Sequence, residues 1–122
     1  MSCLFDSLSF AVGINPLNLR LIICNYLENN PALVDDLKLS AILKATESLS
    51  LTEYTRKMSN ESTWGSALEL KSFCDIFSMS VQVHVTYTGQ EFTIVCSNPK
   101  PRKLVHIYYN GSHYEPGWAD LL

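Results

Sequence analysis

Residues 67–96 of the chain read ALELKSFCDIFSMSVQVHVTYTGQEFTIVC, and a change of hydrophobic period inside this stretch sets the fold class. Apolar residues recur at helical spacing over 67–77, as they do on one face of an amphipathic helix. From residue 80 the period becomes two, with valines at 81, 83 and 85 alternating with polar residues. Thr88-Gly89 then predicts a tight turn into a strand over 92–96. The stretch therefore predicts a helix followed by a β-hairpin.

The segments on either side extend this order. Towards the N-terminus, helical spacing predicts helices over 4–12, 17–27, 35–44 and 50–58, the second started by Asn15-Pro16 and the last by the capping-box pair Ser50 and Glu53. Towards the C-terminus, 104–109 is predicted to be a strand, and Asn110-Gly111 a turn into a short extended piece. Helices come first and a small, mostly antiparallel sheet comes last, which is an α+β order.

The composition bounds the classes of function. The 122 residues are 47% hydrophobic and 17% charged, with a formal net charge of −3, so we expect one globular domain spanning 1–122 and no nucleic-acid partner. No apolar stretch reaches the roughly 18 to 20 residues that a membrane span needs. The first residues lack the basic region of a secretory signal. We therefore expect a cytoplasmic protein.

The cysteines and histidines do not form a recognisable metal-binding motif. Cysteines stand at 3, 24, 74 and 96 without a C-x-x-C pair, and histidines stand at 84, 106 and 113 without the usual ligand spacing. We expect no metal and no cofactor. Cys24, Cys74 and Cys96 lie on apolar stripes and are predicted to be buried. Alternation predicts a solvated His84, and His106 is interpreted as structural.

Cys3, His113 and Glu115 have the chemistry of a thiol hydrolase. Cys3 immediately precedes a predicted helix, where the helix dipole and free backbone N–H groups favour a thiolate. His113 follows a tight turn, and Glu115 lies two positions later, on the same face of an extended chain. A carboxylate there can bind one ring nitrogen and leave the other as a base. The residues alone leave open whether thiol and imidazole meet.

Three motifs together resemble a known family. Residues 3–8 read CLFDSL, residues 62–70 read STWGSALEL ahead of the predicted helix and strand, and residues 107–115 read IYYNGSHYE. In this order and spacing they resemble an ovarian-tumour (OTU) cysteine protease, especially the short viral kind. The resemblance covers nearly the whole chain and implies a papain-like OTU fold.

The resemblance also implies an activity and a set of residues. Family members hydrolyse the (iso)peptide bond after the C-terminal diglycine of ubiquitin or a related modifier, and some viral members also cleave their polyprotein, in the host cytoplasm. Cys3 takes the place of the nucleophile, His113 of the general base and Glu115 of the residue that orients the base. Trp64-Gly65 resembles the segment that helps to shape the narrow channel for the glycines. Residues 110–112 resemble the loop that positions the histidine. The residues implied in substrate binding are Trp64, Gly65, Ser66, Asn110, Gly111, Ser112 and Tyr114.

The chain departs from the family pattern at two places, and two other interpretations stay open. The family usually has Asp or Asn where Glu115 stands, and D-G-x before the cysteine, where this sequence has only Met1 and Ser2. We expect either a longer polyprotein source or a differently built oxyanion hole. One alternative is a non-catalytic OTU-like module that binds ubiquitin or another protein. The other is a structural α+β domain in which Cys3, His113 and Glu115 never meet.

Overall fold

The computed structural model describes residues 3–116, and of Cys3 only the backbone. The described chain folds into five helices and six strands: α1 (Cys3–Val12), α2 (Pro16–Glu28), β1 (Ala32–Val34), β2 (Leu37–Lys38), α3 (Leu39–Thr46), α4 (Leu51–Met58), α5 (Ala67–Phe77), β3 (Met79–Val85), β4 (Gln90–Ile94), β5 (Lys103–Tyr109) and β6 (Tyr114–Pro116). Helices precede the main sheet in the chain, so the predicted α+β class is confirmed.

The main sheet has four strands in the order β4-β3-β5-β6. The β3–β4 and β5–β6 pairs are antiparallel, as predicted for the two turns, but β3 and β5 are parallel, with Val83 opposite Ile107. A parallel neighbour needs a crossover rather than a hairpin, and the segment 95–102 supplies it. The sheet is therefore mixed, with two antiparallel pairs and one parallel pair.

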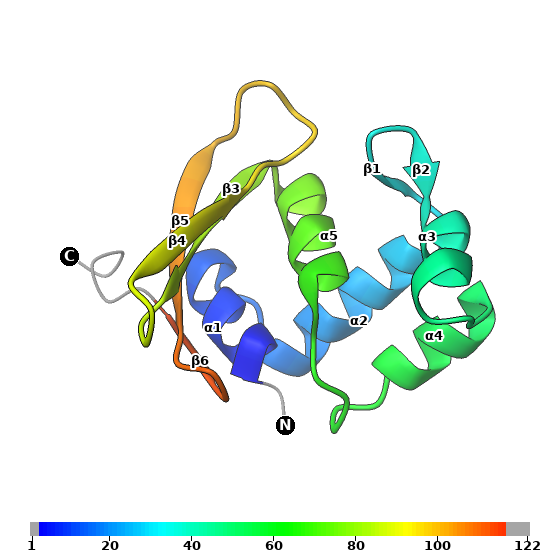
Figure 1. Ribbon diagram of the computed structural model, residues 1–122, viewed down its shortest axis with the longest axis horizontal. Helices are drawn as coiled ribbons and strands as arrows, with labels where there is room; N and C mark the ends of the chain where they lie inside the picture. The colour runs from blue at the N-terminus through cyan, green and yellow to red at the C-terminus, as the bar shows by residue number, and fades with distance from the viewer. Residues whose placement is uncertain (1–2, 117–122) are drawn as a thin grey trace.

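Helices α1 and α5 cover one face of this sheet. Figure 1 shows the sheet on one side of the molecule, α1 and α5 against it, and α2, α3 and α4 stacked further away. The alternating residues of β3 and β5 that face α1 and α5 are buried, because a strand presents successive side chains to opposite faces. The centre of the core consists of Phe5, Leu8, Leu19, Ile23, Leu27, Phe73, Val81, Val83, Val105 and Ile107.

The predicted helix over 35–44 is wrong in its first half. Residues 32–38 form the small β1–β2 hairpin, and α3 begins only at Leu39. Asp35 has a φ of 52°, a left-handed conformation that a helix cannot contain and that Asp tolerates in turns. The Asn30 side chain then accepts a hydrogen bond from the backbone N–H of Ser40 at 2.7 Å, which satisfies one of the unpaired donors at the start of α3.

The other predicted helices are confirmed with small shifts at their ends. Asn15 caps α2 by accepting from Leu17 N–H, with Pro16 as the first helical residue. Ser50 and Glu53 form the predicted capping box of α4. Among the described residues no single helix is long and apolar enough to cross a membrane; only Leu4–Val12 and Pro16–Glu28 taken together, at 95° to one another, pass such a test by length and composition.

Candidate active site

Three segments that carry the predicted site residues converge at one end of the molecule. In Figure 1 the first turn of α1 lies at the lower edge, between the β5–β6 turn on one side and the α4–α5 segment on the other. The contacts agree with this view, because α1 packs against β6 and Gly65 touches Leu4. The fold therefore brings the backbone of Cys3, the His113 turn and the Trp64 segment into one region.

The first turn of α1 is anchored by its apolar side chains. Leu4 and Phe5 are buried in the core, and Leu8 follows on the same face. Cys3 is the first helical residue, so its backbone N–H belongs to the unpaired donors of the helix N-terminus. The side chain of Cys3 lies outside the described part of the structure. The helix that carries it packs directly against the strand that follows His113.

The turn that precedes His113 is held by the side chain of Asn110. Its Oδ1 accepts hydrogen bonds from the backbone N–H groups of Ser112, at 3.0 Å, and His113, at 2.8 Å. The backbone N–H of Asn110 donates to the His113 carbonyl at 3.1 Å. Asn is favoured in such turns because its short side chain mimics a backbone acceptor. The backbone position of His113 is thus fixed, while its imidazole is exposed.

Gly111 and two tyrosines complete this turn. Gly111 has a φ of 100°, a conformation that disfavours side chains, and a β-carbon added there would lie 3.3 Å from the ring of Tyr87. The hydroxyl of Tyr109 donates to the Gly111 carbonyl at 2.9 Å. Tyr87 comes from the turn between β3 and β4 and is largely exposed beside the candidate site. No sequence pattern points to Tyr87, because its contact with Gly111 depends on the parallel β3–β5 pairing.

Glu115 and Tyr114 point to different sides of β6. Glu115 pairs with Tyr108 in the sheet and is exposed, two residues after His113. The Tyr114 ring packs against the core and against Tyr109, with ring centroids 4.7 Å apart. Successive strand residues alternate in direction, so Glu115 shares the side of His113 along an extended chain. That Tyr114 contacts substrate stays a prediction; its ring packs against the core side of the turn.

The Trp64–Ser66 segment lies directly against α1. A β-carbon added to Gly65 would meet the Cδ2 of Leu4 at 2.5 Å and the Cε2 of Phe5 at 3.2 Å, so only glycine allows this approach. The neighbouring Trp64 is 54% exposed, which is high for so large an apolar side chain. The backbone next to an exposed tryptophan is therefore held against the start of the cysteine-bearing helix.

Ser66 fixes the other end of this segment through a buried network. Its backbone N–H and its hydroxyl donate to Glu69 Oε1 at 2.6 and 2.7 Å, and the Tyr54 hydroxyl donates to Glu69 Oε2 at 2.6 Å. Burial raises the pKa of Glu69, although these donors act in the opposite direction. Burial and the neighbouring Glu69 raise the pKa of Tyr54. The spacing Ser66-x-x-Glu69 is a capping-box signature that could have predicted this network.

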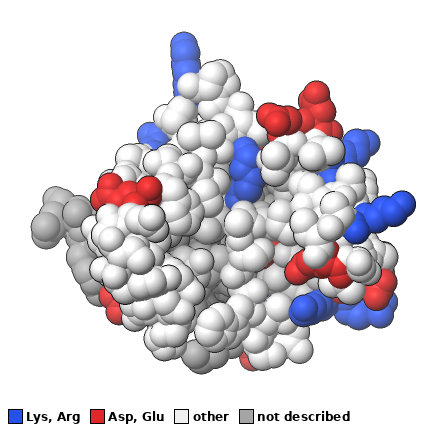
Figure 2. Space-filling view, viewed as in Figure 1, with Lys and Arg blue, Asp and Glu red and all other residues white. Residues whose placement is uncertain are grey.

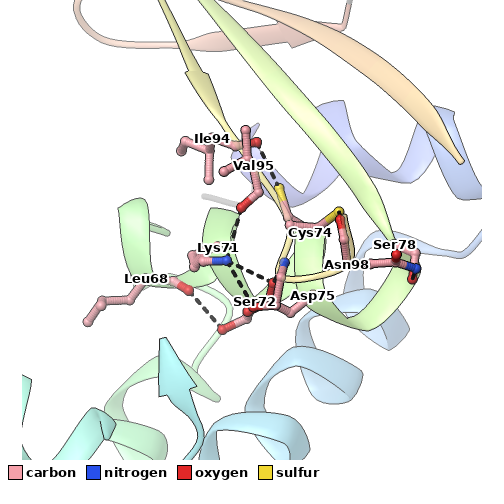
Figure 3. Close-up of polar contacts among 11 residues, drawn as sticks. Leu68, Lys71, Ser72, Cys74, Asp75, Ser78, Ile94, Val95 and Asn98 are labelled. Atoms are coloured by element: carbon pink, nitrogen blue, oxygen red, sulfur yellow. Dashed lines mark hydrogen bonds and ion pairs between the residues drawn. The ribbon is translucent and has the colours of Figure 1, made fainter. Parts of the chain in front are cut away.

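A separate groove of about 640 Å³ lies between the β1–β2 hairpin, α5 and the end of β4. Figure 3 shows its polar contacts: Lys71 Nζ binds Asp75 Oδ1 and the Val95 carbonyl, both at 2.9 Å, and Cys74 Sγ contacts the Ile94 carbonyl at 3.5 Å. Burial raises the pKa of the Cys74 thiol to about 12. These contacts tie β4 to α5 and leave Cys74 an inert thiol, as its predicted burial suggested.

The outer face of the sheet carries a histidine network that corrects one prediction. The His84 side chain is only 18% exposed rather than solvated: its Nδ1 lies 2.8 Å from Glu91 Oε1 and its Nε2 lies 2.9 Å from His106 Nδ1. Its ring also stacks on Tyr108 at 4.5 Å. Within the described residues, no group of three or more His, Cys, Asp or Glu side chains is arranged to hold a metal ion.

Charged side chains are unevenly distributed on the face that Figure 2 shows. Most of the acidic and basic groups lie over the helices far from the sheet, and the surface over α1 and the start of α5 is largely uncharged.

Comparison with known proteins places these features in a family. Residues 2–115 match the family described as "OTU-like cysteine protease". A curated relative, "Putative ubiquitin thioesterase otu1" of Schizosaccharomyces pombe, is 32% identical over 116 residues; the match covers 93% of this chain, which spans about a third (32%) of the length of that relative. The solved "Structure of Ovarian Tumor (OTU) domain in complex with Ubiquitin" is 20% identical, has a TM-score of 0.74, and matches 94% of this chain and 62% of its own. The "Structure of OTUD1 OTU domain" is 13% identical, with a TM-score of 0.69 and coverages of 94% and 77%.

Proposed function

This chain belongs to the OTU-like cysteine protease family, and we propose that it is a deubiquitinase: a thiol hydrolase that cleaves the (iso)peptide bond after the C-terminal diglycine of ubiquitin or a ubiquitin-like modifier. One observation carries the proposal. Helix α1, which begins at Cys3, packs against β6, which follows His113, and Leu4 in its first turn contacts Gly65. The three motifs of the family thus converge although they are distant in the chain.

The proposed reaction proceeds through a thioester. His113 takes the proton of the Cys3 thiol, and the thiolate attacks the carbonyl carbon of the terminal glycine. The carbon–nitrogen bond then breaks as His113 returns the proton to the leaving amine. A water molecule, deprotonated by His113, attacks the thioester, so the glycine carboxylate leaves and the thiol is restored. Glu115 accepts a hydrogen bond from the imidazole and orients it.

The position of Trp64 supports a preference for glycine on the acyl side of the scissile bond. Trp64 is 54% exposed, and the adjacent Gly65 contacts Leu4 in the first turn of α1, so we expect a substrate that reaches Cys3 to pass the indole. Residues without side chains leave the most room for such a passage. A polyprotein segment that ends in glycine would satisfy the same requirement. We propose that the chain is of viral origin and that such a polyprotein is its second substrate. We place the activity in the cytoplasm, where the resemblance puts it.

The test uses ubiquitin whose C-terminus carries a fluorogenic amide. We expect turnover by the wild-type chain, none by Cys3→Ala, and a large loss in His113→Ala, with unchanged circular dichroism in both variants. An electrophilic ubiquitin probe should form one covalent adduct with the wild type and none with Cys3→Ala. Folded wild-type protein that binds ubiquitin but neither turns over nor labels would instead identify a non-catalytic binding module.

A further inference from the structure

Arg20 of α2 is a charged side chain in the core of the protein. Arg20 is fully buried, with 0% of its surface exposed. Burying a charge is costly unless hydrogen bonds compensate for the lost water. Nη1 donates to the Met58 carbonyl at 2.8 Å and contacts the Met58 Sδ at 3.7 Å, and Nη2 donates to the Glu61 carbonyl at 3.3 Å. Met58 ends α4, and the last carbonyls of a helix have no partner within the helix. Arg20 therefore binds the beginning of the segment that connects α4 to α5.

The same guanidinium contacts the first turn of α1. Its central carbon lies 4.2 Å from the centroid of the Phe5 ring, a cation–π geometry. Phe5 is two residues from Cys3 and is itself fully buried. Its ring also lies next to Gly65, whose added β-carbon would be 3.2 Å from Phe5 Cε2. The Arg20 side chain thus contacts both α1 and the segment between α4 and α5, the two elements that flank the candidate site.

The segment that carries Trp64 is consequently held at both ends by buried polar side chains. Arg20 binds the carbonyls of Met58 and Glu61 at its start, and Glu69 binds the N–H and hydroxyl of Ser66 at its end. Trp64 stands between these two anchors. An apolar side chain of similar volume could occupy the place of Arg20, but it could not bind two carbonyls in a fixed direction.

We propose that Arg20 is a positioning residue for the hydrolysis proposed above: it fixes the place of Trp64 relative to the first turn of α1, and so determines how well the glycine end of the substrate binds. The proposal rests on the proposed function for its consequence in catalysis. The placement of Trp64 is a separate physical statement that can be measured without substrate.

The decisive variant is Arg20→Lys, which keeps the charge but loses the planar fork that reaches both carbonyls. With the fluorogenic ubiquitin substrate, we expect KM to rise about 5- to 10-fold while kcat changes less than about 2-fold, because binding contacts and not the reacting groups are displaced. In a Trp118→Phe background, the fluorescence anisotropy of Trp64 should fall. Leu27→Ala, a buried substitution two turns further along α2, is the matched control: it should lower the melting temperature and leave KM and the anisotropy unchanged.

Two results would overturn the proposal. One is a wild-type KM and anisotropy in Arg20→Lys; the other is an equal rise of KM in Leu27→Ala, which would reveal a general effect of instability. If Arg20→Lys does not fold, Phe5→Leu removes the ring contact, keeps an apolar side chain and is interpreted in the same way. If the wild type itself shows no turnover, the proposed function fails, while the anisotropy still decides whether Arg20 positions Trp64.

Discussion

Gly65 and Leu4 are in such close contact that a β-carbon on Gly65 would lie 2.5 Å from the Cδ2 of Leu4. Leu4 is buried, so its side chain has little room to move away. We expect Gly65→Ala to destabilise the protein by about 1–3 kcal/mol and to raise KM for the fluorogenic ubiquitin substrate. Gly13→Ala is the control, because its added methyl meets nothing within 4 Å and only its positive φ is strained. If both variants have the wild-type KM, this contact does not shape the site.

Asn110 is expected to act through the backbone of His113. Asn110→Ala removes the acceptor of two backbone N–H groups, which should cost about 1 kcal/mol and lower kcat. Asn110→Asp keeps the acceptor and should retain most of the activity. Urea unfolding and steady-state kinetics of the two variants provide the measurement. Equal losses in both would show that the amide group, and not the acceptor oxygen, is what the turn requires.

Glu115 provides a test of the orienting carboxylate. Glu115→Gln keeps the size and removes the charge, and we expect kcat to fall about 10-fold or more if the carboxylate stabilises the imidazolium. Glu115→Asp keeps the charge on a shorter side chain and should stay within a few-fold of the wild type. The stability of both variants should be close to that of the wild type, because the side chain is exposed. Wild-type kcat in Glu115→Gln would remove Glu115 from the proposed mechanism.

Selective alkylation should distinguish Cys3 from the other three thiols. Cys24, Cys74 and Cys96 are buried, and burial raises the pKa of Cys24 and raises that of Cys74 to about 12. Iodoacetamide at about pH 7.5 should therefore modify Cys3 in the native protein and all four cysteines only after denaturation. Mass spectrometry of the peptides identifies the sites, and Cys3→Ala is the control. Rapid native modification of Cys74 would contradict this expectation.

The buried carboxyl of Glu69 predicts a pH dependence of stability. Its pKa in the folded protein is raised above the value of about 4.3 in an unfolded chain, so the folded state binds the proton more tightly. Its contribution is therefore most favourable below about pH 4.3 and is lost as the pH rises through the folded-state pKa. Glu69→Gln should remove this dependence. Urea unfolding of both proteins from about pH 4 to pH 8 should show the wild type losing stability relative to the variant; parallel curves would contradict it.

Capping residues and hydrophobic spacing predicted most of the helices correctly, but they did not predict the parallel pairing of β3 with β5. Asn15-Pro16 and the Ser50–Glu53 pair act within a few residues, so α2 and α4 begin where their caps require. The β1–β2 hairpin was missed because its apolar residues also fit a helical pattern, and Asp35 in a left-handed conformation decides between the two. The parallel β3–β5 pair depends on a crossover whose direction no periodic pattern records.

Some residues of the candidate site were likewise predicted from the sequence, and others were found only in the structure. The motif around Gly65 predicted a segment of the candidate site, and in the structure this segment contacts Leu4 of α1. Arg20 was not predicted, because a single arginine among the apolar residues of a helix gives no sign that it is buried. Tyr87 was missed because its partner, Gly111, lies on another hairpin. Both contacts arise from packing between distant segments, which sequence patterns describe least well.

The sheet order β4-β3-β5-β6 places β6 at an edge, where it meets α1. Ribosomal synthesis makes the cysteine of α1 first and the histidine before β6 late, and between them lie most of the described residues. A nascent chain that has not yet added His113 therefore has a thiol without its base. Under the proposed mechanism, the protein cannot cleave its substrate until this edge strand has docked, so completion of the domain and onset of activity coincide.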